Sequence, residues 1–561
     1  MNPTLRALRA LALLSGFHLL GLLMLALLGA VDWAAVTWTS GPVYVKVVIV
    51  SVLLAVPIVR GMFMLRTPKD PDGAPGPSVT EAQEPRLWQT VRELAEQVGT
   101  RAPDEIVLVA GVNAAVTEDA RLGGLLPGPR RMYLGLSLMA GLDENRLRSV
   151  IAHELGHFVH ADTRLGALVG RGQARLLRTI GHFEEKADST VAKERARQEK
   201  RADKRTARGK KAKAVDTTGS GITYRTMAKI YTGYAKLYVR ATRSDARRQE
   251  FAADLAAARI TGRDATAGAL RATPALDAAH DFYMDAYATL GVDAGLLPRP
   301  GEVFGGLRHM IEARPDALAE ASTSLPTETA GPYDTHPPIA ERVARIEALP
   351  YDGRGAETAG PALGLLADAG ARLAEIEKYV LTPQALGLRR VDWPDLVHES
   401  MRTYTARAGE TLRTAVAAEC GGEGTAAAML DAIDAGALWR IAEQLPKSEE
   451  ARAASGRAAR EFVRPALHRG LRQLVVLELA DRGAARWLLS WSDEAELRLP
   501  DGFDDRLGPA LDAAVGDRPD TGPLRDLLAR AAPRTPVPSP APSPASSAAS
   551  SAASSALTKE S

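Results

Sequence analysis

The sequence predicts a mainly helical protein with a small β-sheet, an N-terminal transmembrane helical hairpin and an all-helical C-terminal domain. Two apolar runs lie within the first 65 residues, and three short strand candidates precede a helix that carries two histidines near residue 150. Residues 361–533 are rich in alanine, leucine and arginine and have helical periodicity throughout. A chain of 561 residues is long enough for about three folded units.

The overall composition bears on the partners of the protein, on its possible cysteine sites and on its compartment. The chain has 70 basic and 68 acidic residues, so no global electrostatic field favours nucleic acid as a partner. Its single cysteine, Cys420, excludes an internal disulfide and a zinc site built from thiolates. A reducing compartment is therefore expected for everything that folds after the apolar runs.

The two apolar runs predict a membrane anchor over residues 1–66. The first, Ala10 to Ala30, is about long enough to cross the hydrocarbon core. The second, Val43 to Leu65, is interrupted only near its ends by basic residues that can reach the headgroups. Trp33 and Trp38 fall between the runs, where an interfacial aromatic belt is expected. A cleaved signal peptide is the alternative for the first run, and the second run close behind it disfavours that.

The distribution of basic residues predicts the orientation of this anchor. Arg6 and Arg9 precede the first run, and Arg66 and Lys69 follow the second. The connection between the runs has no Lys or Arg before position 46. By the positive-inside rule, both ends of the anchor face the cytoplasm. We therefore expect a multi-pass protein of the plasma membrane whose catalytic domain lies on the cytoplasmic side.

Short elements follow the anchor. Residues 67–78 contain four prolines and two glycines and are typical of a linker. Apolar residues at helical spacing between positions 87 and 98 then predict a helix. Three strands are expected next, at Glu105 to Ala110, Asn113 to Thr117 and Arg131 to Leu136. These elements begin a domain over residues 79–350.

The stretch His153-Glu154-Leu155-Gly156-His157 follows the strands. Asp143 is a suitable N-cap, so the stretch is expected to lie on a helix whose positions 153 and 157 share a face. We refer to this helix as the metal helix. Two histidines so placed, with a third protein ligand, can hold a catalytic zinc, and Glu154 can accept a proton from its water. The alternative is an ordinary amphipathic helix with two surface histidines. This helix does not supply the third ligand.

Residues 161–183 and 222–243 are two further helices, each with its basic residues on one face. The second also carries four tyrosines. Such helices can lie at a membrane interface with the tyrosines at the apolar boundary, or they can present a solvated basic face over a packed core. Between them, residues 184–221 are lysine- and arginine-rich and lack aromatic residues, which predicts a disordered insert.

Two more motifs follow along the chain. Glu250 and Asp254 are four residues apart on a predicted helix from Ser244 to Ile260. A rigid turn at Thr335-His336-Pro337-Pro338 precedes a last helix of this domain. The three motifs, in this order and with Arg342 after the turn, resemble the HtpX-type and CAAX-prenyl-protease-type zinc metalloendopeptidases. The resemblance covers roughly residues 1–350.

This resemblance implies a zincin-like α+β protease domain that holds one zinc ion per chain. It implies that Glu250 is the third zinc ligand and that Asp254 orients a zinc-bound histidine. Asp162 also matches the family pattern near the end of the metal helix. Asn113 and Ala114 would pair with an extended substrate, and His336 and Arg342 would line the cleft. A histidine donor such as His336 can stabilise an oxyanion.

The expected function is that of a membrane-anchored zinc endopeptidase acting on proteins or peptides, with Glu154 as general base. By family resemblance, its role is in membrane-protein quality control. The polar helices after the metal helix, where family members carry two further spans, favour a site on the cytosolic surface. The alternative is a non-enzymatic, zinc-bound membrane scaffold, which has no need of Glu154. A site-2-type intramembrane protease is disfavoured by arginines in the metal helix. Residues 361–533 show no familiar motif, and residues 534–561 are expected to be a disordered Pro/Ala/Ser tail.

Overall fold

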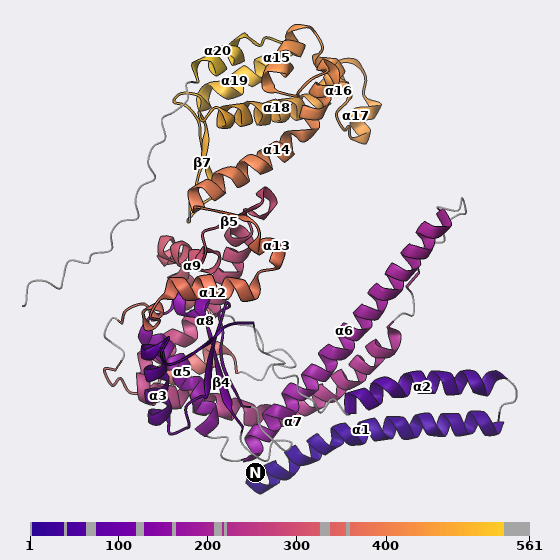
Figure 1. Ribbon diagram of the computed structural model, residues 1–561, viewed down its shortest axis with the longest axis vertical. Helices are drawn as coiled ribbons and strands as arrows, with labels where there is room; N and C mark the ends of the chain where they lie inside the picture. The colour runs from indigo at the N-terminus through magenta and orange to yellow at the C-terminus, as the bar shows by residue number, and fades with distance from the viewer. Residues whose placement is uncertain are drawn as a thin grey trace, which may run out of the picture. The chain divides into compact units, whose positions relative to one another are not determined.

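The computed structural model describes residues 3–38, 42–62, 75–118, 128–159, 164–206, 216–217, 221–325, 337–354 and 359–531. The protein is mainly helical with small sheets, as expected (Figure 1). It divides into two compact units. The first comprises Met1–Phe282 and Phe304–Leu381, and the second comprises Tyr283–Val303 and Thr382–Ser561.

The predicted boundary at residue 361 stays a prediction, and in the structure the contacts of the first unit extend to Leu381. Residues 359–381 belong to the first unit because their backbone bonds to the start of the metal helix: the Ala362 amide donates to the Leu142 carbonyl at 3.0 Å. The fully buried Glu84 carboxylate also accepts hydrogen bonds from the Ala367 amide at 2.6 Å and from Arg372 at 2.7 Å. Residues 283–303 conversely belong to the second unit. Of the predicted linker, residues 67–74 lie outside the described residues, as does the predicted tail.

A four-stranded sheet lies in the first unit, in the order β1-β2-β4-β3. Its strands are β1 (Ser78–Val79), β2 (Glu105–Val109), β3 (Ala114–Glu118) and β4 (Arg130–Gly135). The central strands β2 and β4 are parallel and largely buried, whereas β1 and β3 are antiparallel edge strands. The three predicted strands are thus present, and the two-residue β1 was missed because it is too short to show alternation.

Two helices of this unit pack closely on each other, α5 (Glu144–Val159) and α7 (Ile222–Thr261). Their close approach depends on a glycine, because a Cβ at Gly156 would lie 3.2 Å from the Ala253 Cα. Helix α5 also packs on strand β3. Besides these two and the helices α1, α2 and α6, which are described below, the first unit contains α3 (Pro85–Val98), α4 (Leu136–Gly141), α8 (Arg263–Tyr283), α9 (Glu302–Ala313, shared with the second unit), α10 (Pro315–Thr323), α11 (Ile339–Glu347), η5 (Ala362–Leu365) and α12 (Ala369–Val380).

The N-terminal helices α1 (Pro3–Trp38) and α2 (Pro42–Met62) lie side by side and pack on α6 (Arg164–Thr206) and α7 (Figure 1). Within the part of the chain that the structure describes, one helical segment, His18–Trp38, is long and apolar enough to cross a membrane. A shorter apolar segment, Val43–Val56, lies in α2. The membrane hairpin that the sequence predicts therefore stays a prediction for α2.

Helix α6 corrects the prediction of a disordered insert (residues 184–221) over residues 184–206. The helix runs without interruption to Thr206. Alanine, glutamate, lysine and arginine dominate this stretch, and all four are good helix formers. Side-chain pairs one turn apart add to its stability, such as Arg195 with Glu199 at 3.7 Å and Gln198 donating to Glu194 at 2.9 Å. The high charge that suggested disorder is also compatible with an exposed helix.

The second unit is built on two long helices that pack together, α14 (Trp393–Cys420) and α18 (Gly456–Asp481). The all-helical prediction for this part is wrong in detail, because two two-stranded sheets occur: β5 (Leu296–Pro298) with β6 (Arg389–Val391), and β7 (Arg486–Leu488) with β8 (Glu496–Arg498). Each strand has only three residues, too few to show a period of two. The other elements are η3 (Met284–Ala288), η4 (Val292–Ala294), α13 (Pro383–Leu386), α15 (Ala426–Asp434), α16 (Leu438–Glu443), α17 (Glu449–Ala453), α19 (Asp504–Ala514) and α20 (Gly522–Arg530).

Candidate active site

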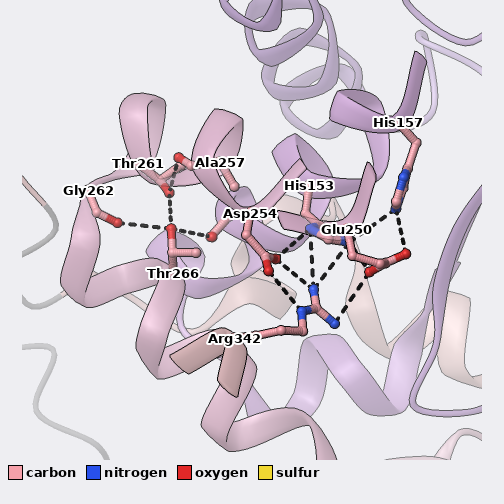
Figure 2. A network of polar contacts seen from close by, with 10 residues as sticks. His153, His157, Glu250, Asp254, Ala257, Thr261, Gly262, Thr266 and Arg342 are labelled. Carbon is pink, nitrogen blue, oxygen red and sulfur yellow. Dashed lines mark hydrogen bonds and ion pairs between the residues drawn. The ribbon is translucent and has the colours of Figure 1, made fainter. Parts of the chain in front are cut away.

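Helices α5 and α7 bring together three residues that can hold a metal ion, His153, His157 and Glu250. The histidines lie one turn apart on α5, and their Nε2 atoms are 3.2 Å apart. The Glu250 carboxylate comes from α7, with its Oε2 atom 3.6 Å from His153 Nε2 and its Oε1 atom 3.6 Å from His157 Nε2. Figure 2 shows the three side chains pointing toward one another. The structure thus brings Glu250, from a separate helix, to the two histidines.

These distances fit a zinc ion. Nitrogen and oxygen ligands lie about 2.0–2.1 Å from zinc in tetrahedral sites, which puts neighbouring ligand atoms about 3.4 Å apart. The observed separations of 3.2 and 3.6 Å lie on either side of that value. Two imidazoles and one carboxylate are also a ligand set that zinc accepts in catalytic sites, where a fourth position stays open. The residues present therefore fit zinc.

A buried carboxylate supports the first histidine. Asp254 is 1% exposed, and its Oδ1 atom lies 2.9 Å from the Nδ1 atom of His153. An acceptor at Nδ1 fixes the proton there and leaves Nε2 with a lone pair for a metal. Burial raises the pKa of Asp254, but hydrogen bonds from Arg342 and His153 outweigh it and lower that pKa to about 2. Asp254 is therefore ionised at neutral pH.

Arg342 completes this arrangement from helix α11. Its Nε and Nη2 atoms donate to the two carboxylate oxygens of Asp254 at 2.8 and 2.6 Å, and its Nη1 atom lies 3.6 Å from Glu250 Oε2 (Figure 2). Burial lowers the pKa of Arg342, but the carboxylates of Asp254, Glu250 and Glu154 raise it above its usual range. Arg342 is 7% exposed. The family resemblance implies a place in the substrate cleft for Arg342, whereas its guanidinium is bound to Asp254, the carboxylate that contacts His153.

Glu154 follows His153 directly on α5 and is partly buried. Its charge helps to raise the pKa of Arg342, and its position in the chain is next to the first metal ligand. Strand β3, which begins at Ala114, packs beside the same helix, and among the described strands it pairs only with β4. An edge strand next to a metal site can bind an extended peptide. Asn113 directly precedes this strand, and its carbonyl accepts a hydrogen bond from the Gly135 amide at 2.8 Å.

Two predicted site residues, Asp162 and His336, lie outside the described residues. A set of hydroxyl contacts between α5, α7 and α8 was not expected from the sequence. Ser149 donates to Thr266 at 2.9 Å, and Thr266 lies 3.3 Å from Thr261 and donates to the Gly262 carbonyl (Figure 2). Ser149 is four residues before His153 on α5 and so shares the face of the helix that carries the histidines. This spacing was the one signal in the sequence that could have indicated its buried contact.

Comparisons with known proteins agree with this geometry. Residues 81–349 match the model of peptidase family M48. Over these residues, which are just under half of the chain, the protein is similar to peptidase family M48. Residues 153, 154, 157 and 250 all lie within the matched M48 region. The resemblance that the motifs indicated is thereby confirmed.

Two curated relatives support this M48 assignment over short segments. A protease HtpX homolog 1 of Saccharolobus solfataricus is 36% identical over 84 residues, which are 15% of this chain and 25% of that protein. A protease HtpX homolog of Methanothermobacter thermautotrophicus is 32% identical over 91 residues, which are 16% of this chain and 33% of that protein. The match thus spans between a quarter and a third of these relatives. No solved structure matches the chain.

Proposed function

We propose that this M48 protein is a membrane-anchored, zinc-dependent endopeptidase. The observation that carries the proposal is the convergence of His153, His157 and Glu250 at zinc-like separations, with Glu154 next to His153 in the helix. A purely structural metal site has no need of a carboxylate next to its ligands. The proposal also rests on the M48 match and on the word protease in the names of both relatives.

Each residue has a part in the proposed reaction. Zinc, when bound, supplies a Lewis acid that polarises the peptide carbonyl and lowers the pKa of water to about 7. His153, His157 and Glu250 hold the ion, and Glu154 accepts the proton of the attacking water and delivers it to the leaving amine. Strand β3 binds the substrate backbone as an added strand. The ionised Asp254, held by Arg342, keeps the His153 ring in the orientation and tautomer that this requires.

Two further roles are proposed for residues outside the described part of the chain. His336 is proposed as a hydrogen-bond donor to the oxyanion that forms at the scissile carbonyl. Asp162 is proposed to support the end of the metal helix. The described neighbours of His336, Pro337 and Pro338, lead directly into α11, which carries Arg342. Pro338 is four residues before Arg342, whose guanidinium lies 3.6 Å from Glu250, which supports the first of these roles.

The anchor and its orientation are also proposals. Together, the apolar segment His18–Trp38 and the largely exposed apolar residues of α2 support a two-span anchor with the M48 domain in the cytoplasm. A reporter enzyme that is active only outside the cytoplasm should stay inactive when it is fused to the N-terminus or inserted after residue 70. An active reporter at either position would overturn the orientation. Surveillance of membrane proteins is the role that this placement favours.

The proposed activity is tested by cleavage of casein with the purified full-length protein. Cleavage should stop when a chelator removes the metal and should return when zinc is added. Glu154→Gln should keep about one zinc per chain and lose about 10²–10⁴-fold in rate, because only the proton acceptor is removed. If metal-loaded protein leaves casein and a panel of unfolded membrane proteins intact, the zinc-bound scaffold becomes the better description.

A further inference from the structure

Helix α7 presents two different faces over residues 222–243. One face is apolar and aromatic and packs inside the protein, where Tyr231 is 0% and Tyr238 2% exposed. The opposite side is basic. This stretch contains five basic residues and no acidic one, and four of them are exposed: Arg225, Lys229, Lys236 and Arg240. We refer to these four as the basic stripe.

The partners of the buried face are known from the structure. Tyr231 stacks on Phe183 of α6 at a centroid distance of 5.5 Å, and both belong to a cluster that includes Ile58 of α2. Met24 and Leu28 of α1 pack on the same cluster. The tyrosines therefore face protein, which agrees with the alternative of a basic face over a packed core. Over residues 222–243, a contact of α7 with a membrane would use the exposed side that carries the basic stripe.

The same cluster of helices also presents an apolar surface. Leu19, Leu23 and Leu27 follow one face of α1 and are 62%, 67% and 65% exposed. Ile49 and Val52 of α2 are 54% and 56% exposed. An apolar surface of this kind suits the hydrocarbon of a bilayer, and a basic surface suits anionic headgroups. One packed helix cluster thus carries both surfaces that a bilayer boundary requires.

We infer that the basic stripe of α7 contacts anionic lipid headgroups while α1 and α2 enter the bilayer. Figure 1 shows the α1–α2 pair and the α6–α7 pair diverging beyond the contact that they share, and the basic stripe lies on the side of α7 away from that contact. Ile222 and Leu237, which are 63% and 57% exposed, flank the stripe and can rest on the edge of the acyl region. The charged side chains of the stripe stay with the headgroups.

This contact has a consequence for the metal centre. Helix α7 is continuous from Ile222 to Thr261, and Glu250 is ten residues beyond Arg240. Ten helical residues span about 15 Å. If the headgroups hold the stripe, the metal centre therefore lies within about 15 Å of the bilayer surface, measured along α7. Polypeptide segments next to a membrane are then the substrates that reach it most readily, and this last step rests on the proposed function.

The inference is tested on the full-length protein in lipid nanodiscs, with a fluorescent thiol label at Leu237→Cys in a Cys420→Ser background. The matched control is the native chain labelled at Cys420, which is exposed in the second unit. In nanodiscs with about 30% phosphatidylglycerol, a quencher attached to lipid headgroups should quench label 237 and leave label 420 unchanged. Raising salt from 0.05 to 1 M shortens the Debye length from over 10 Å to about 3 Å and should reverse at least half of the quenching.

Charge reversal supplies the second arm. One variant carries all four substitutions of the stripe, Arg225→Glu, Lys229→Glu, Lys236→Glu and Arg240→Glu. It should abolish the quenching of label 237 and leave the zinc content unchanged. If this variant does not fold, the salt titration decides the question. The inference is wrong if label 237 is not quenched in anionic nanodiscs, or if quenching is equal in phosphatidylcholine and insensitive to salt. Protection of label 237 by an RNA homopolymer but not by anionic nanodiscs would assign the stripe to nucleic acid and likewise overturn the inference.

Discussion

Glu250→Ala is expected to leave the purified protein with almost no zinc and no measurable casein cleavage. The variant removes one of three ligands, and the two histidines that remain cannot hold the ion against water and buffer. We expect zinc affinity to fall by more than the 10–100-fold that is typical when only a supporting group is lost. The measurement is metal content per chain after gel filtration in zinc-free buffer, followed by a zinc titration.

A neighbouring residue on the same helix gives the control. Arg248 is exposed on α7. Arg248→Ala should keep about one zinc per chain, so a loss seen only in Glu250→Ala reports on the ligand and not on the helix. Zinc retained at the wild-type level in Glu250→Ala would contradict the assignment. The third ligand would then be sought among His160, Asp162 and Glu184.

The candidate site was largely predictable because its residues sit on local motifs. His153 and His157 share a helical face by their spacing alone, and so do Glu250 and Asp254. The two pairs of residues meet because α5 packs on α7. This depends on the contact of Gly156 with Ala253, nearly 100 residues apart in the chain. Periodicity carries no information on such a contact, so only the family resemblance connected the two motifs.

The fold was predictable where elements are long and periodic, and it was missed where they are short or set by distant contacts. The paired strands β7 and β8 have three residues each, too few for alternation to be recognised. Residues 184–206 were expected to be disordered because charge density was weighed above helix propensity. Likewise, nothing near residue 361 indicates that this segment joins the first unit, since the hydrogen bond that holds it there comes from Ala362 to Leu142.

Arg342 is the residue whose predicted role and observed surroundings differ most. The sequence analysis placed it in the substrate cleft, whereas the structure binds its guanidinium to Asp254 through two hydrogen bonds. The two roles predict different kinetics. A substrate-binding arginine affects KM and leaves zinc affinity alone. A positioning arginine affects zinc affinity even when no substrate is present.

Arg342→Leu is therefore expected to weaken zinc binding by about 10–100-fold, because it leaves the Asp254 charge buried without its partner. Loss of one member of a buried pair also destabilises a fold by about 3–5 kcal/mol, which denaturant unfolding of the metal-free protein would detect. Arg342→Lys should be intermediate, since lysine keeps the charge but cannot donate bidentately. In the double variant with Asp254→Asn, the loss of stability should be smaller than the sum of the two single losses, because the buried charge is gone. A raised KM with wild-type zinc affinity and stability in Arg342→Leu would instead return this residue to the substrate cleft.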